Sequence, residues 1–584
     1  MKKSILILFG KNLPPKRWLQ RAKWYDMVIS SAALQDGVQK VGLEWKSLEN
    51  FVEPGSVHDA GVMAEKLSRL SLPDGSCLSK ASVYKGYELW WTHLDDIFLY
   101  FCLPHTQYQK LLNYVRDFEI VYLYEPPFKN LFSCYLEAHE RKMVTISKIS
   151  FNFSLGIFFQ ILLTTLCLPL LMFRKYSRMV FIGDKLEKDR DHDFRMRFIY
   201  EELRKRKSSF VEFIRSPESW KAVLQHAWIR KRPVVYAEAV TFLGRLMSIL
   251  SGGRRHAERT FGSNLFRGEM IPENRFYLLI ATQYLLTIGD DIWSIRIMQW
   301  ILQLTKVKVA IIIAASERNW HTVIGCKLNN IPTVGILHGI NTYHYNMYDF
   351  LRGFDGENML SVDRYGLWSE WWRDYYLKYS DAYKPEQLFV SGPMRPLETN
   401  VDEANQKSFT EDRTKVLFIS EQVAEPQEVL PFFTEILANR DFEVTIKFRP
   451  SRDGFEMWLL KHQPELLKEV PIMRGSIQEA IASNDVVVGT HSTAVLESLF
   501  QFKVPIFFDT HKWGDYFNLK EYGVDQSFFA SNYEELIKKI QLAKNVSPDE
   551  IIELRKRFFG DSYKNGSAWV VEQMEKYLTE RGNQ

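Results

Sequence analysis

The most informative chemistry in this sequence lies in one short block, Gly489 to Glu497, which reads GTHSTAVLE. A valine-rich run that predicts a buried strand ends at this block, and small hydroxyl residues, Thr490, Ser492 and Thr493, then begin a helix. Backbone N–H groups at the positive end of a helix suit a phosphate or diphosphate. Glu497 follows one turn later, where its carboxylate could accept both hydroxyls of a ribose. The alternative is that Ser492 is an ordinary N-cap and Glu497 a solvated helix residue.

Two further groups follow strands predicted at 307–313 and 333–337, the first containing Glu317 and the second His338 and Gly339. Open α/β sheets form their ligand crevice at the carboxyl ends of parallel strands, so both groups are expected at such a crevice. There, a carboxylate and an imidazole could deprotonate an acceptor hydroxyl and offset the charge on a departing phosphate. The alternative is that Glu317 caps the following helix and Gly339 permits a tight turn.

Three cations follow strands nearer the C-terminus. Arg395 lies in the segment SGPMRP after a strand predicted at 387–390, and Lys447 and Arg449 end the strand that reads VTIKFRP. An arginine offers a forked pair of donors that matches phosphate. The alternatives are a solvated loop arginine and a charged strand edge.

Signatures of other chemistries are missing from the sequence. No GxxxxGK[ST], GxGxxG, GxSxG or HExxH pattern occurs, and the five cysteines show no CxxC or Cys/His ligand spacing. The triplet Asp191-His192-Asp193 could hold a divalent metal, but its place before a predicted helix favours an N-terminal cap. We therefore expect no metal site and no bound cofactor.

The elements that must position these residues are strands alternating with helices, which predicts an α/β fold in tandem units. Residues 1–150 form an N-terminal α/β, Rossmann-like unit of unclear role, with an aromatic, helical middle at 80–118. A second Rossmann-like unit is expected at 174–345, with a largely helical stretch up to about 270. A third is expected at 346–584, ending in a closing C-terminal helix. Two such units in tandem predict a crevice between them.

One segment breaks the average composition, because residues 151–173 carry no charged side chain. As a helix, 23 residues would reach about 34 Å, enough for a bilayer core of about 30 Å. Basic residues flank the segment on both sides, so charge gives no orientation. Three interpretations remain open: an in-plane or shallowly inserted anchor, a true span, and a core or oligomer-interface helix.

Overall charge and the N-terminus narrow the class of protein. The chain has 75 Lys and Arg against 71 Asp and Glu, too mild a balance to indicate nucleic acid as a partner. The first apolar run is short and is interrupted by Gly10-Lys11, which favours a buried first strand over a signal peptide. We expect a cytoplasmic protein with reduced thiols.

Taken in order, these motifs resemble those of GT-B-fold glycosyltransferases of bacterial surface-polysaccharide assembly, of the capsule, lipopolysaccharide or teichoic type. The matching segments are SERNW, IPTVGILHGI, VSGPMRP, VTIKFRP and SNDVVVGTHSTAVLESLFQFKVPIFF. The resemblance covers about 174–580 and leaves 1–150 without a clear family. It implies two Rossmann-like domains in a GT-B arrangement, with residues 174–345 on the acceptor side and 346–584 binding the donor.

The resemblance also implies roles for individual residues. Ser492 and Thr493 would bind the donor phosphate and Glu497 the ribose, while His338 would face the reacting centre and Glu317 would be the base. The family often has His-Pro where this chain has Arg449-Pro450, and an arginine cannot act as a base at neutral pH. His491 is the candidate to replace that histidine. Enzymes of this fold generally work without a catalytic metal.

The function implied is transfer of a sugar, or a related activated unit, from a nucleotide donor to a lipid-linked or polymeric glycan acceptor. The expected location is the inner face of the cell membrane, as a peripheral or monotopic protein. Two alternatives remain: a nucleotide-sugar epimerase of the same fold, which needs no lipid anchor, and a non-catalytic scaffold of polysaccharide assembly.

Overall fold

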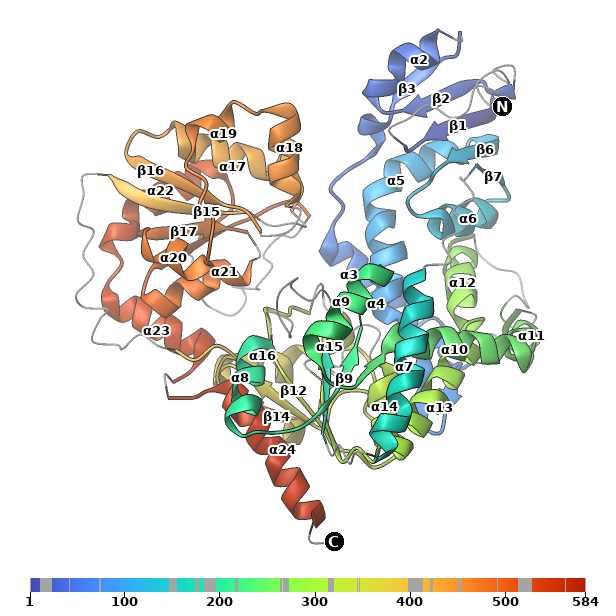
Figure 1. The fold of residues 1–584 in the computed structure, drawn as a ribbon. Coiled ribbons are helices and arrows are strands. Elements are labelled where there is room, and N and C mark those ends of the chain that lie inside the picture. Colours follow the sequence, from blue (N-terminus) through green and yellow to red (C-terminus); the bar gives the residue numbers. More distant parts are fainter. Residues whose placement is uncertain are drawn as a thin grey trace.

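The computed structural model describes most of the 584 residues. The described ranges are 2–10, 24–40, 42–72, 75–146, 155–173, 178–182, 196–215, 219–262, 265, 272–312, 320–343, 345, 347–397, 413–420, 424–449, 453–490, 492–512, 528–561 and 563–582. They form three α/β units (Figure 1). We call residues 2–146 the N-terminal unit, 178–397 together with the last helix the middle unit, and 413–561 the C-terminal unit.

The N-terminal unit is built on a parallel sheet of order β3-β2-β1-β6-β7. Its strands are β1 (Lys2–Leu8), β2 (Met27–Ser30), β3 (Trp45–Ser47), β6 (Phe118–Tyr124) and β7 (Lys142–Ile146). Ile5 to Leu8 are fully buried, as expected for a parallel strand covered on both faces. The predicted buried first strand is therefore confirmed.

Helices of the N-terminal unit cover this sheet and extend away from it. They are α3 (Val57–Ser68), α4 (Leu94–Ile97), α5 (Leu103–Val115) and α6 (Lys129–Ala138). The predicted aromatic, helical middle is confirmed: the 3₁₀ segment η5 (Leu89–His93), α4, the π-helical η6 (Phe98–Cys102) and α5 follow one another. Trp90, Trp91 and Phe98 are buried there, so this stretch is core that joins the N-terminal unit to the middle unit.

The middle unit contains a parallel sheet of order β10-β9-β8-β11-β12-β13-β14. Its strands are β8 (Arg178–Ile182), β9 (Val211–Ile214), β10 (Val234–Tyr236), β11 (Val309–Ile311), β12 (Thr333–Ile336), β13 (Arg364–Leu367) and β14 (Leu388–Val390). The order runs outward in both directions from the neighbours β8 and β11. That is the topological switch point, where such sheets bind ligands.

One expectation about this sheet is wrong. The strand at 387–390, expected to start the third unit, pairs with β13 and so belongs to the middle sheet, which therefore extends well past residue 345. The stretch expected to be largely helical up to about 270 does contain the helices α9 (Trp220–Arg230), α10 (Ala237–Leu250) and α11 (Gly253–Ala257), together with the short edge strand β10. A sequence pattern identifies a strand, but pairing partners far along the chain decide which sheet it joins.

The C-terminal unit has a parallel sheet of order β16-β15-β17-β18-β19. Its strands are β15 (Thr414–Ile419), β16 (Phe442–Lys447), β17 (Val486–Gly489), β18 (Val504–Phe508) and β19 (Phe529–Ala530). The helices are α17 (Pro426–Ala438), α18 (Gly454–His462), α19 (Leu466–Glu469), α20 (Ile477–Ala482), α21 (Thr493–Leu496), α22 (Tyr533–Leu542) and α23 (Pro548–Phe559). The strands predicted at 415–419, 443–448, 486–488 and 505–508 are confirmed.

The last helix, α24 (Gly566–Gly582), leaves the C-terminal unit and packs on the middle unit (Figure 1). Ser567 Oγ donates to the carbonyl of Met394 at 2.7 Å, and Glu575 pairs with Arg178 at the start of β8 at 2.6 Å. The predicted closing helix is confirmed. With two parallel α/β units in tandem, a further N-terminal unit and an apolar helix, the predicted fold class is confirmed as well.

The uncharged segment forms α7 (Leu155–Phe173), which lies along the middle unit. It packs against β10 and against α9 (Trp220–Arg230), α10 (Ala237–Leu250) and α13 (Ile288–Thr305). Its buried residues are Gly156, Gln160, Thr164 and Leu171. Among the described helices, α7 alone is long and apolar enough to cross a bilayer. Since most of its apolar side chains face outward, α7 is not a core helix of this chain.

Close packing around one of two glycines predicts that substitution by alanine lowers the stability of the protein more at that glycine than at the other. Gly392 and Gly252 both have left-handed φ angles, +80° and +73°. A Cβ on Gly392 would lie 2.7 Å from Lys564 Cβ, whereas one on Gly252 would meet open space. Each alanine substitution costs about 1 kcal/mol in backbone strain. We expect Gly392→Ala to lose about 1–3 kcal/mol more by overpacking, measured by chemical denaturation. Equal losses would contradict the packing described here.

Candidate functional site

A turn of the middle unit meets a helix start of the C-terminal unit at the candidate site. The Ile340 N–H, in the turn after β12, donates to Thr493 Oγ1 at 3.1 Å. A Cβ on Gly339 would lie 3.6 Å from the same oxygen. The structure therefore brings together two groups that the sequence placed separately at strand ends: the turn with His338 and Gly339, and the block with Thr493. His338 is half-buried in this turn.

Hydrogen bonds from other residues of the middle unit hold the turn after β12 in place. The Leu337 N–H donates to the carbonyl of Gly366 at 2.8 Å, and Trp368 Nε1 donates to the carbonyl of Leu337 at 2.6 Å. A few residues on, Asn341 Nδ2 donates to Asp349 Oδ2. These bonds fix the backbone that faces Thr493.

Asp349 anchors this support from the core. It is fully buried and accepts hydrogen bonds from three tyrosine hydroxyls as well as from Asn341. The tyrosine donors are Tyr376 and Tyr383, each at 2.9 Å, and Tyr365 at 3.2 Å. Burial raises the pKa of Asp349, while these hydrogen bonds favour the ionised form and limit the rise. The cluster positions the turn and does not itself reach the crevice.

Arg395 and Glu497, predicted separately, also meet between the two units. Arg395 Nη1 lies 3.7 Å from Glu497 Oε2, and Gln478 Nε2 donates to the same oxygen at 3.0 Å. Burial raises the pKa of Glu497, and the charge of Arg395 opposes that rise. The Glu497 side chain remains 22% exposed, so its carboxylate lies at the margin of the crevice and not in the core.

The hydroxyl block itself departs from the simple helix-terminus expectation. Ser492 Oγ accepts from the Ala494 N–H at 3.2 Å, which makes Ser492 the N-cap of α21. That helix is a single turn, followed by the 3₁₀ segment η11 (Glu497–Gln501). A helix this short has a weak dipole, so any anion bound here depends mainly on individual N–H groups and side chains. Thr490, the second residue of the block, is buried.

Gly489 explains how β17 turns sharply into this block. A Cβ on Gly489 would lie 2.6 Å from Val495 Cγ2 and 3.1 Å from the carbonyl of Ile419. Only glycine therefore lets the strand end pack so closely under α21.

The two predicted cations Lys447 and Arg449 lie at the carboxyl end of β16, which does not neighbour β17 in the C-terminal sheet. Lys447 is buried, and its Nζ donates to the carbonyl of Gly475 at 2.8 Å. Burial and the neighbouring Arg474 lower the pKa of Lys447. Arg449 is exposed, and its backbone N–H donates to Asp453 Oδ2 at 3.1 Å. Because β15 separates β16 from β17, the role of both cations in donor binding stays a prediction.

Several predicted positions lie outside the described residues. They are Glu317, the candidate base, His491, the candidate replacement for the family histidine, and the Asp191-His192-Asp193 triplet. Among the described residues, no group of three or more His, Cys, Asp or Glu side chains is placed to hold a metal ion.

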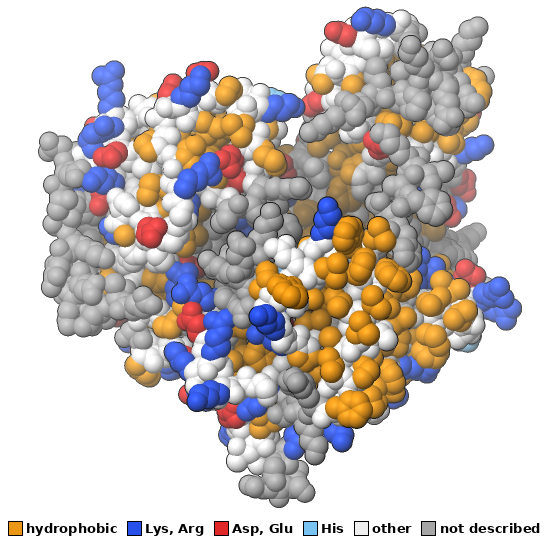
Figure 2. Space-filling model, in the orientation of Figure 1, with side chains coloured by type: hydrophobic (Ala, Val, Ile, Leu, Met, Phe, Trp, Pro, Cys, Tyr) orange, Lys and Arg blue, Asp and Glu red, His pale blue; other side chains and the backbone are white. Residues whose placement is uncertain are grey.

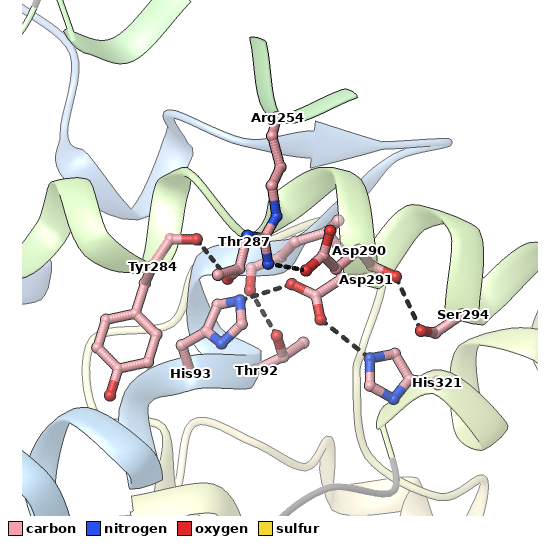
Figure 3. Close-up of polar contacts among 10 residues, drawn as sticks. Thr92, His93, Arg254, Tyr284, Thr287, Asp290, Asp291, Ser294 and His321 are labelled. Atoms are coloured by element: carbon pink, nitrogen blue, oxygen red, sulfur yellow. Dashed lines mark hydrogen bonds and ion pairs between the residues drawn. The ribbon is translucent and has the colours of Figure 1, made fainter. Parts of the chain in front are cut away.

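A cluster of charged side chains that the sequence analysis did not predict joins the N-terminal and middle units (Figure 3). His93 Nε2 lies 2.8 Å from Asp291 Oδ2, and His321 Nε2 lies 3.1 Å from Asp291 Oδ1. Asp291 is in the first turn of α13, and His321 is the second residue of α14 (Trp320–Leu328). Beside them, Arg254 pairs with Asp290 at 2.9 Å.

The electrostatics of this cluster favour an ion pair. Burial alone lowers the pKa of His93, but the charge and hydrogen bond of Asp291 outweigh it, so the pKa is raised above 6.5. Burial alone raises the pKa of Asp291, but the two imidazoles hold it well below its usual range. Each imidazole meets a different carboxylate oxygen, so the cluster fixes the start of α14 by hydrogen bonds.

A hollow of about 680 Å³ opens elsewhere, at the amino ends of β12, β13 and β14. Its lining includes Pro332, Asp363 and Gln387, which immediately precede or start these strands. Ligand crevices of open α/β sheets form at the opposite, carboxyl ends, where Gly339 and Thr493 meet. We therefore place the candidate site at the crevice between the units.

No protein-family model and no curated protein matches this chain. Among solved structures, it is similar to the glycotransferase of kitacinnamycin, with 12% identity, 69% of this chain and 100% of that chain covered, and a TM-score of 0.41. It is also similar to the UDP-GlcNAc 2-epimerase of Methanocaldococcus jannaschii (11% identity, 68% and 99% covered, TM-score 0.39). It is also similar to the UDP-GlcNAc 2-epimerase of Neisseria meningitidis bound to UDP-GlcNAc (10% identity, 69% and 99% covered, TM-score 0.39). At these low values, the fold of this chain rests on its own sheet order.

The ion pair of Asp291 predicts a pH-dependent loss of stability. The raised pKa of His93 means that the pair stabilises the fold below about pH 6.5, and that this contribution is lost as the pH rises through the raised value. The lowered pKa of Asp291 means that the contribution is present above pH 3.8 and is lost as the pH falls through the lowered value. We expect Asp291→Asn to cost about 3 kcal/mol between these limits, and less at pH 9, measured by denaturation.

The adjacent Asp290→Asn is the matched control. Its partner, Arg254, does not titrate in this range, so its loss of stability should be the same at pH 5.5 and pH 9. A loss for Asp291→Asn that does not change with pH would contradict the ion pair.

Proposed function

We propose that this chain is a glycosyltransferase that moves a sugar, or a related activated unit, from a nucleotide donor to a lipid-linked or polymeric glycan acceptor in surface-polysaccharide synthesis. The observation that supports it most is the meeting of two units at one crevice, through Ile340 with Thr493 and Arg395 with Glu497. A donor and an acceptor bound to opposite sides of such a crevice are brought into reach of each other.

On the C-terminal side, Glu497 is proposed to accept the ribose hydroxyls of the nucleotide. Gly489 lets β17 pack closely under the start of α21, and Thr490, Ser492 and Thr493 are proposed to bind the diphosphate. In the structure, Arg395 lies beside Glu497. When the nucleotide is bound, the guanidinium of Arg395 is proposed to donate a forked pair of hydrogen bonds to the diphosphate. In this proposal, Arg395 and backbone N–H groups offset the charge on the leaving diphosphate, without a bound cofactor.

On the middle-unit side, His338 is proposed to face the reacting carbon, with Glu317 as the base. The acceptor hydroxyl attacks the anomeric carbon, its proton passes to the base, and the bond between that carbon and the diphosphate oxygen breaks. His491 is proposed to protonate the departing phosphate.

The proposed location is the cytoplasmic face of the cell membrane, where lipid-linked acceptors are found. An epimerase acting on the same donor would need no acceptor. Incubation with a nucleotide sugar alone separates the two activities: a transferase without an acceptor leaves the nucleotide sugar unchanged, whereas an epimerase gives a product inverted at C2, visible by NMR.

Donor binding is the direct test of the crevice. We expect one nucleotide-linked compound from a CMP, UDP, GDP, dTDP and CDP series to raise stability by about 2.7 kcal/mol at 100 times its Kd. Glu497→Gln should weaken that binding at least about tenfold, because a charged acceptor of two hydroxyls is lost. Glu443→Gln, at an exposed position on β16, is the matched control and should bind as the wild type does.

Failure to bind any member of the series, or equal binding by Glu497→Gln and the wild type, would contradict the assignment of the donor site. If the donor binds but no nucleotide is released with lipid-linked or glycan acceptors, the transferase proposal is wrong and the epimerase or scaffold remains.

The raised pKa of Glu497 adds a pH signature to donor binding. The ribose contact needs the ionised carboxylate, so donor affinity should increase as the pH rises through the raised value and then level off. Isothermal titration between pH 5 and pH 8 should show this increase in the wild type and lose it in Glu497→Gln. The same slope in both proteins would show that another group titrates.

A further inference from the structure

Helix α7 buries two of its polar side chains and exposes many of its apolar ones. Gln160 and Thr164 are 1% and 4% exposed, and Thr164 Oγ1 accepts from the backbone N–H of Tyr236 at the end of the edge strand β10 at 3.1 Å. Leu166, in contrast, is 58% exposed and Phe173 is 88% exposed. A surface helix of a water-soluble domain normally shows the reverse pattern.

The outward apolar side chains of α7 follow helical spacing and continue onto neighbouring helices. On α7 they are Leu155, Phe158, Leu162, Leu166, Leu170, Met172 and Phe173; on α9 they are Trp220, Leu224 and Trp228; and on α10 they are Leu246, Met247, Ile249 and Leu250. We call this set the apolar face. Figure 2 shows hydrophobic side chains gathered in one broad patch over this part of the middle unit. Contiguous patches of this kind mark interaction surfaces.

The composition around the apolar face indicates what covers it. The exposed charged residues on α9, α10 and the segment up to residue 262 are mostly basic, namely Lys221, Lys231, Arg245, Arg255 and Arg259, with Glu258 as the exposed acidic one. Trp220 and Trp228 combine an apolar ring with a polar N–H, a combination typical of the membrane interface. A basic border complements anionic lipid headgroups. A second copy of this chain, seated symmetrically, would instead bring like charges together.

Contacts elsewhere in the chain indicate that α7 lies in the plane of the membrane and does not cross it. Residues before and after α7 meet directly, through His93 with Asp291 and through Arg275 with Glu140. Both sides of α7 therefore lie on the same side of any bilayer. Lifting α7 off the middle unit would also expose Gln160, Thr164 and the end of β10 to lipid.

We propose that the apolar face of α7, α9 and α10 inserts into one leaflet of a bilayer that carries anionic headgroups, with the basic border at headgroup level. The face reaches the ligand-binding edge of the middle sheet, because α9 starts just after the carboxyl end of β9 and Phe159 of α7 stacks on Trp220 at 5.8 Å. The apolar face and the turn after β12 thus lie at the same edge of the middle sheet. The membrane contact itself does not depend on which reaction the crevice carries out.

Vesicle flotation of the full-length protein tests this directly. We expect the protein to float with vesicles of phosphatidylcholine mixed with phosphatidylglycerol, and less with phosphatidylcholine alone. Leu162→Ser/Leu166→Ser/Leu170→Ser should weaken binding at least about tenfold, since three exposed apolar side chains are lost from the contact. The matched control, Met457→Ser/Leu460→Ser/Leu542→Ser, removes three exposed apolar side chains from the C-terminal unit and should float as the wild type does.

A charge variant tests the border separately. Lys221→Glu/Arg245→Glu should remove the preference for phosphatidylglycerol while leaving the thermal midpoint unchanged, because both side chains are exposed. Donor binding should be unaffected in every variant, so a failure here is distinct from a failure of the proposed reaction.

Four outcomes would overturn the proposal. The first is wild-type protein that stays unbound with both vesicle types, and the second is equal loss of flotation in the apolar-face variant and its control. The third is a wild-type dimer that binds no vesicles and becomes monomeric in the apolar-face variant, which would assign the face to a second copy. Protection of residues 2–146 from added protease by sealed vesicles would instead show a span and would also overturn it.

Discussion

The hydrogen bond from the Ile340 N–H to Thr493 Oγ1 is the contact on which the candidate site depends. It joins a turn of the middle unit to the first turn of a helix in the C-terminal unit, so it sets how far apart the two walls of the crevice lie. It has this effect only because its donor is rigid. Asp349 beneath the turn, and Trp368 beside it, fix the backbone from Leu337 onwards.

The N-terminal unit also supports the candidate site by packing against the middle unit. Its aromatic segment packs into the middle unit, and His93 reaches Asp291 at the start of α13. Arg352 and Glu65, at 3.1 Å, tie the same two units together at another point. Since His321 shares Asp291, the N-terminal unit helps to fix the helix that follows the segment predicted to carry the base. The N-terminal unit is thus part of the framework of the candidate site.

Much of this architecture could be predicted from the sequence, because local patterns report buried strands reliably. The meeting of Gly339 with Thr493 was also foreseeable in part, since both follow parallel strands and such strand ends share one edge. The membership of β14 in the middle sheet was not, because pairing with β13 is a long-range choice. Nor was the contact of His93 with Asp291, because the two residues lie far apart in the chain and neither has a distinctive neighbour. For α7, the sequence showed an apolar helix but not which side chains would face outward.

The covalent path of the chain between the middle and C-terminal units has a mechanical consequence. The chain leaves the middle unit after Pro393 and returns at Gly566, and the Gly566 N–H donates to the carbonyl of Pro393 at 2.9 Å. The two crossings lie side by side, and Trp372 Nε1 of the middle unit also donates to the carbonyl of Phe558 in α23 at 3.0 Å, so this side of the interface is the natural axis for a rotation of the C-terminal unit. Such a rotation separates Ile340 from Thr493, and also the Val57 N–H from the carbonyl of Lys512, while the crossings stay intact. The two walls of the proposed donor site would then part while the crossings hold the units together.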